Sequence, residues 1–201
     1  MGFFDFFKRQ DKTEPKKPPV EPNGRGEFNL QLSDFSLKIH KSVILEDVKI
    51  DTEFNKEFAH LLVGKPAKAG DAIELKSYYL NIVLWGQSAE VMFDSGIAHD
   101  SLQDFILKIN QQLNWLVKSK NLVEEVIIRD LLQLKNDNWL EENQSQLNKD
   151  EFLRSIQLTS INFSQHAEFN MLFDAGDLFE KHSINVKVGS KKEVEKATIV
   201  G

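Results

Sequence analysis

The spacing of the apolar residues changes twice along this chain, and this change constrains its fold more than any other feature. From Phe28 onward apolar and polar residues alternate, a period of two that is typical of β-strands. In the middle of the chain apolar residues recur every three or four positions, as on one face of a helix. From Thr159 the period returns to two. Strands, then helices, then strands predict an α+β protein, with antiparallel sheet covered by helices on one face.

The strands can be placed more closely. Two or three short antiparallel strands are predicted between Phe28 and Ile50. Segments Ile73–Trp85 and Ala89–Phe93 predict a hairpin that turns near Gly86. Near the C-terminus we predict four more strands, at residues 159–163, 169–173, 184–188 and 194–200.

Three helices are predicted between the two sets of strands. Asp100 or Ser101 can cap the first, whose apolar positions form one stripe that ends at Val117. A second helix starts at Asn121, and the short joint between the two predicts an antiparallel helical hairpin. A third, short helix begins at Asn148, with a glutamate three positions later that completes a capping box.

Residues 1–27 differ in composition from the rest. They hold four of the five prolines, interspersed with charged residues and with Gly24 and Gly26. Such a segment buries too little apolar surface to offset its ordering entropy, so we expect a flexible tail. The remaining residues, 28–201, are predicted to form a single α+β domain. The alternative that residues 28–66 form a separate N-terminal β lobe stays open.

The beginning of this tail is rich in phenylalanine, with Phe3, Phe4, Phe6 and Phe7 close together. Exposed apolar clusters often mark an interaction surface, although so short a segment forms no stable helix alone in water. Three outcomes are open. The cluster docks back onto its own domain or has no role; it binds a partner as a helix in a groove; or it contacts a membrane surface peripherally.

The overall composition excludes several classes of protein. A net charge of −6 argues against a nucleic-acid partner, which requires clustered Lys and Arg. The absence of cysteine excludes a disulfide framework and a thiolate metal site. No apolar run approaches the roughly 20 residues that span a bilayer, and no signal peptide is recognisable. We expect a cytoplasmic protein without a cofactor, since it carries no phosphate-binding, zinc-protease or serine-hydrolase motif.

The best candidate for chemistry is the group Asp174, Asp177 and His182, with His166 across the neighbouring hairpin. Two carboxylates and an imidazole can bind a divalent metal or transfer protons. The structural alternative is simple, because aspartate and glycine are also what a tight turn requires. In that case His182 is a histidine of the core or of a strand edge.

Several segments of the C-terminal half together resemble a bacterial family, the domain of unknown function 2262. The similar segments are Arg129–Asn136, Trp139, Lys149–Leu153, Phe173–Phe179, His182–Val186 and Ala197–Gly201. The resemblance covers about residues 70–201 and also includes Trp85-Gly86. The chain departs from the family pattern where Glu180-Lys181 replaces Trp-Gly and Ala175 is inserted in the acidic turn. The resemblance supports the fold and implies no established activity.

The function expected from these observations is a non-enzymatic protein-binding or regulatory module. Its size and acidity would suit a toxin-neutralising role, an argument by analogy. A protein partner is expected, and nothing in the sequence identifies it or defines the oligomeric state. The alternative is a metal-dependent hydrolase or small-molecule-binding protein that uses Asp174, Asp177 and His182.

Overall fold

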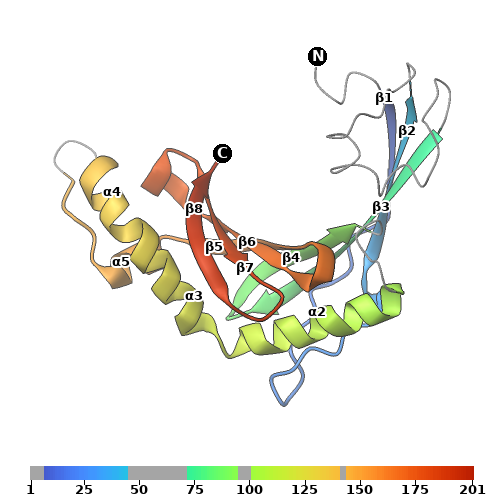
Figure 1. The fold of residues 1–201 in the computed structure, drawn as a ribbon, viewed down its shortest axis with the longest axis horizontal. Coiled ribbons are helices and arrows are strands. Elements are labelled where there is room, and N and C mark those ends of the chain that lie inside the picture. Colours follow the sequence, from blue (N-terminus) through green and yellow to red (C-terminus); the bar gives the residue numbers. More distant parts are fainter. Residues whose placement is uncertain (1–6, 45–71, 95–100, 141–143) are drawn as a thin grey trace.

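The computed structural model describes residues 7–44, 72–94, 101–140 and 144–201. They form one eight-stranded sheet in which the strands lie in chain order (Figure 1). The α+β class is confirmed, and the sheet is larger than expected. The strands are β1 (Phe7–Thr13), β2 (Ser36–Ile44), β3 (Ala72–Leu84), β4 (Gln87–Asp94), β5 (Gln157–Phe163), β6 (Phe169–Asp174), β7 (Ser183–Val188) and β8 (Val194–Val200).

One pair of neighbouring strands is parallel. Residues 90–92 of β4 pair with residues 160–162 of β5 in parallel, whereas all other neighbours are antiparallel. Parallel neighbouring strands need a long crossover connection. All the α-helices of the described chain lie in the crossover that connects β4 to β5. The expectation of a purely antiparallel sheet is therefore wrong at this pair, because the helices return the chain to the end where β4 began.

The first helix of the crossover is α2 (Leu102–Val117). The hydroxyl of Ser101 accepts a hydrogen bond from the N–H of Asp104 at 3.2 Å, which confirms the predicted N-cap. The apolar stripe of the helix is buried through Phe105, Ile109 and Leu113. This stripe holds α2 against the sheet.

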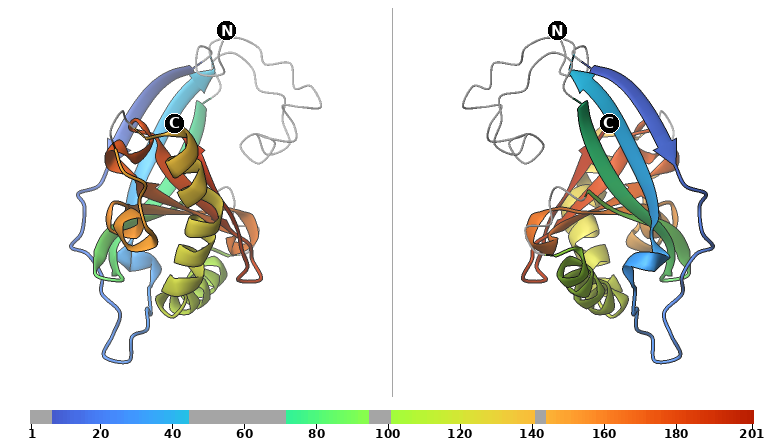
Figure 2. Two further views of the ribbon diagram at one scale, coloured as in Figure 1. Left: turned by 90° about the vertical axis from the view of Figure 1, so that its left-hand side faces the viewer. Right: turned by 90° about the vertical axis from the view of Figure 1, so that its right-hand side faces the viewer.

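The second helix is continuous but changes its winding. It consists of α3 (Lys120–Ile127), the π-helical turn η5 (Ile128–Leu132) and α4 (Gln133–Asn138). The predicted antiparallel hairpin with α2 is wrong. In Figure 2 the helix α3–α4 is seen lengthwise while α2 is seen nearly end-on, and in Figure 1 the two diverge from their joint. Both helices bury their apolar faces against the sheet, so neither has an apolar face left to pack against the other helix.

The third predicted helix is confirmed as α5 (Lys149–Arg154). The side chain of Asn148 accepts from the N–H of Glu151 at 3.0 Å, and the Glu151 carboxylate accepts from the N–H of Asn148 at 2.9 Å. This reciprocal capping box satisfies two backbone donors at the start of the helix.

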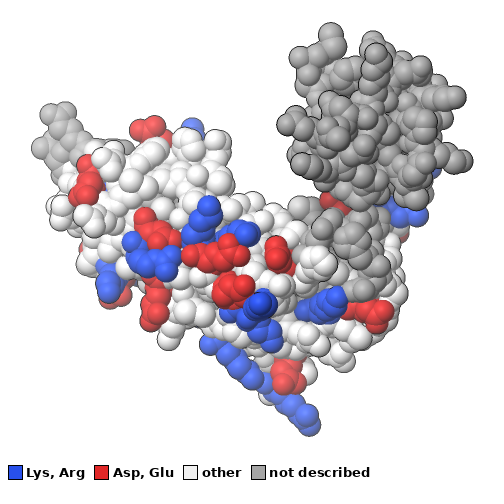
Figure 3. All heavy atoms as spheres, in the orientation of Figure 1, with Lys and Arg blue, Asp and Glu red and all other residues white. Residues whose placement is uncertain are grey.

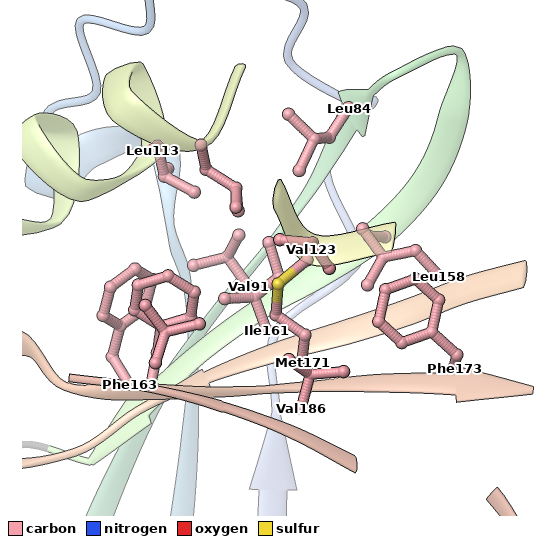
Figure 4. Close-up of a cluster of buried hydrophobic side chains, with 14 of the residues drawn as sticks. Leu84, Val91, Leu113, Val123, Leu158, Ile161, Phe163, Met171, Phe173 and Val186 are labelled. Atoms are coloured by element: carbon pink, nitrogen blue, oxygen red, sulfur yellow. The ribbon is translucent and has the colours of Figure 1, made fainter. Parts of the chain in front are cut away.

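The core lies between the sheet and the helices. Alternate residues of the central strands, among them Val91, Ile161, Met171 and Val186, are fully buried on the face that the helices cover. Figure 4 shows them meeting Leu113 of α2 and Val123 of α3. The predicted C-terminal strands are confirmed, and so is the hairpin of β3 and β4.

Residues 28–31, predicted as a strand, instead form an extended segment bound to α2. The side-chain amide of Asn110 accepts from the N–H of Leu30 at 2.8 Å and donates to its carbonyl at 2.9 Å. Asn114, one turn later, makes the same pair of bonds with Phe28, at 2.6 and 3.0 Å. Two asparagines on one helix face thus replace a neighbouring strand. Phe28 and Leu30 belong to the same buried core as the helices.

Much of the tail expected to be flexible also lies against the sheet. After β1, the backbone of Val20 donates to the carbonyl of Asn81 at 2.8 Å and accepts from the N–H of Val83 at 2.9 Å. The Lys17 ammonium donates to two backbone carbonyls just before β2, at 2.6 and 2.7 Å. Residues 14–20 therefore form a strap along β3. Proline is tolerated in this strap because the strap is not a regular strand of the sheet, and few of its backbone N–H groups need to donate hydrogen bonds.

Candidate functional site

The predicted group of Asp174, Asp177 and His182 lies in the turn between β6 and β7. The Asp174 carboxylate accepts from the N–H of Gly176 at 2.9 Å, a bond that closes the turn. Gly176 has φ +51, a conformation that glycine adopts without strain. Asp177 is exposed. Asp174 therefore acts here as a turn residue.

His182 is bound on its own side of this turn. Its Nδ1 lies 2.8 Å from the carbonyl oxygen of Phe179, and its ring packs edge-on against Trp139 at 5.9 Å. His166 lies in another turn, with φ 60. Among the described residues, no group of three or more His, Cys, Asp or Glu side chains is arranged to hold a metal. The geometry gives Asp174 and His182 structural partners.

A buried lysine lies close to this turn. Lys135 is only 1% exposed, and its ammonium donates to the backbone carbonyl of Trp139 and to the side-chain oxygen of Gln144. Trp139 in turn contacts Phe179, with ring centroids 5.5 Å apart. Lys135 thus closes the C-terminal end of α4, where carbonyls lack helical partners.

The surface of the described chain has a long groove between α3 and α5. An open groove of about 560 Å³ runs between these helices, with Lys120 and Glu124 on one wall and Asp150 and Arg154 on the other. Past Glu124 the groove continues as a second depression of about 420 Å³, lined in part by Arg129. Figure 3 shows positive and negative side chains side by side over this part of the molecule.

A small hole opens in the floor of the groove. Its volume is about 60 Å³, and Trp85, Ile156 and Phe173 are among its walls. Leu153 and Glu124 line both the hole and the groove. The Trp85 ring is fixed because its Nε1 donates to the carbonyl of Leu116 at 3.1 Å. The groove therefore combines a charged rim with an apolar recess.

The far end of the groove is tied to the edge of the sheet. Arg129 and Asp130, both in η5, form a two-pronged ion pair at 2.6 and 2.9 Å. The Asp130 carboxylate also accepts from the N–H of Ala197 at 2.8 Å, and Arg129 donates to the carbonyl of Glu195 at 3.3 Å. Both partners belong to β8, the last strand of the sheet, so the pair closes part of an open edge.

This pair is electrostatically coupled. The hydrogen bond from Arg129 holds the pKa of Asp130 below its ordinary value, and the N–H of Ala197 acts in the same direction against partial burial. The hydrogen bond to Asp130 raises the pKa of Arg129. Such turns of π-helix recur at functional sites, and this one places Arg129 at the groove and binds both Arg129 and Asp130 to β8.

No local signal in the sequence predicts the groove. The predicted helices that begin at Asn121 and Asn148 are far apart in the sequence, and their patterns do not indicate that they meet. Only the contact of α5 with α3 and η5 brings their side chains together. The predicted binding residues Phe3, Phe4 and Phe6 lie outside the described part of the chain. Phe7 begins β1, and its side chain is likewise not described.

Comparison with known proteins adds a family. No curated protein and no solved structure matches the chain significantly. None of the helices in the described part has the length and apolar character needed to cross a bilayer. The model of one family, described as an uncharacterized protein conserved in bacteria, matches residues 73–199, which include all the residues that line the groove. With more than half of its length matched, the chain belongs to this family, DUF2262.

Proposed function

We propose that this protein is a non-enzymatic protein-binding module that holds a segment of its partner in the groove between α3 and α5. The observation that carries the proposal is the combination of a long open groove with an apolar hole in its floor. Protein interfaces concentrate their binding energy in a few anchors that fill such recesses, surrounded by a polar rim.

The form of the groove favours a polypeptide over a small molecule. Small-molecule sites enclose most of their ligand in a largely apolar pocket. This groove is open along its length, and seven charged side chains from α3, η5 and α5 line its two halves: Lys120, Glu124, Glu125, Arg129, Lys149, Asp150 and Arg154. An extended, amphipathic chain segment can match such a surface.

The proposal is tested by capture of a partner from native cell extract with the full-length protein and two double variants. In Lys120→Glu/Arg154→Glu, two exposed cations of the groove are reversed. In the control, Lys191→Glu/Lys192→Glu, the same change in charge is made in the turn between β7 and β8, which lines no part of the groove. Circular dichroism checks that both variants are folded.

We expect one stoichiometric partner that the wild type and the control retain and the groove variant loses. A partner that the groove variant retains would place the contact elsewhere and refute the proposed site. The absence of any stoichiometric partner would refute the binding function itself.

A further inference from the structure

The charges that line the groove occur in three groups. Lys120 and Arg154 line one end. The middle is acidic, through Glu124 and Asp150, which line both halves of the groove. Each group contains one residue of the α3–η5 helix and one residue of α5. From one end of the groove to the other, the residue numbers rise along α3 and η5 and fall along α5. The two helices therefore present their charges in antiparallel order.

The third group, at the other end, is Arg129 and Lys149, and the groove thus reads positive, negative, positive. Along α3 and η5, four or five residues separate neighbouring groups, which corresponds to about 6–7.5 Å, whereas on α5 Asp150 directly follows Lys149. Glu125 of α3 also lines the second half and adds to the acidic middle.

Three of these charges take part in ion pairs within the protein. Lys120 approaches Glu124 at 3.5 Å, and Arg129 is paired with Asp130. Among the described residues, Lys149 and the carboxylate of Asp150 have no ion-pair partner. Arg154 donates only to a backbone carbonyl, at 3.1 Å. Like charges from the two helices thus share each position along the groove, and the three charges of α5, Lys149, Asp150 and Arg154, stay available to a partner.

The apolar hole lies in the first half of the groove, next to Lys120 and Glu124. Its volume is about 60 Å³. A single water needs roughly 10–15 Å³ by the same measure, so the hole has room for about four or five heavy atoms. This is the size of a leucine or isoleucine side chain.

Resting on the proposed function, we infer the chemistry of the partner segment. It carries acidic, basic and acidic side chains in that order, at about the 6–7.5 Å spacing of the charges along α3 and η5, and an aliphatic side chain between the first acid and the base. A polyanion such as a nucleic acid or an anionic membrane does not fit, because its charge would meet the acidic middle of the groove and a protein of net charge −6.

The inference is tested with two synthetic peptides that share the same leucine anchor. One carries the order acid, base, acid, and the other carries the inverted order base, acid, base. Each is titrated into the ¹⁵N-labelled full chain, and amide chemical shifts report both the affinity and the location. Net charge alone would favour the inverted peptide, because the protein is negative and that peptide is positive.

We expect the matched peptide to bind at least about 10-fold more tightly, with shifts along α3 and α5 and an affinity that falls with salt. The variant Asp150→Asn should reduce that preference, whereas Asp177→Asn, an exposed aspartate away from the groove, should leave it unchanged. Tighter binding of the inverted peptide, equal binding of both, or binding of neither overturns the inference. If the capture experiment still yields a partner that depends on the groove, the proposed function stands while this inference fails.

Discussion

Replacement of Asn110 by alanine tests the unusual attachment of the N-terminal segment to α2. Asn110 is 7% exposed and makes both of its hydrogen bonds with the backbone of Leu30, itself 1% exposed. The substitution leaves a buried N–H and a buried carbonyl without partners. Each such group costs about 1–3 kcal/mol, and the better helix propensity of alanine recovers only about 0.7 kcal/mol. We expect a net loss of roughly 1–5 kcal/mol.

Urea unfolding followed by circular dichroism and by tryptophan fluorescence measures this loss. With a denaturant dependence of about 2–3 kcal/mol/M, the midpoint should fall by about 1 M. The matched control is Gln111→Ala, which removes an amide from an exposed position of the same helix and should change stability by no more than about 0.5 kcal/mol. If both variants unfold at the same urea concentration, the paired amide bonds do not hold this segment, and the reasoning is refuted.

Three further changes test other parts of the fold. Asp130→Asn should lower stability at neutral pH. Because the pKa of Asp130 is lowered in the folded state, its contribution is present above the ordinary value of 3.8 and is lost as pH falls through the lowered pKa; urea midpoints of variant and wild type should therefore converge at low pH, and a constant difference would contradict the coupling. Lys135→Ala should cost about 2–4 kcal/mol, through a cavity and an unpaired helix-end carbonyl, whereas Lys191→Ala in an exposed turn should cost nearly nothing; equal midpoints would exclude the capping role. Deletion of residues 1–27 should lower the melting temperature, because it removes β1 and the strap; an unchanged value would restore the free tail expected from composition.

Local signals in the sequence were enough for several elements. The cap at Ser101, the capping box of Asn148 and Glu151, and the turn at Trp85-Gly86 each act within a few residues, and all three are present in the structure. The C-terminal strands were predictable for the same reason, since their alternation reflects one buried and one exposed face.

Features that depend on distant parts of the chain were not predictable. The parallel pairing of β4 with β5 and the divergence of α2 from α3 follow from how the helices cover the sheet. The proline-rich strap was read as disordered because composition does not report the hydrogen bonds that Val20 finds on β3. The acidic turn at Asp174 was predicted as a site because its residue types can bind metals. The groove consists of charged residues on two separate helices, and only the tertiary fold brings them together.

The parallel β4–β5 pair also has a consequence for synthesis. When β4 leaves the ribosome, its partner strand is still about sixty residues away in the sequence. At a synthesis rate of roughly 5–20 residues per second, one edge of β4 stays unpaired for about 3–12 s. During part of that time its apolar face is also not yet covered by the helices. The nascent N-terminal half therefore carries a strand edge that a chaperone or another nascent chain can pair with. Substitutions that slow closure of the crossover should lower the soluble yield in cells before they alter the stability of the finished protein.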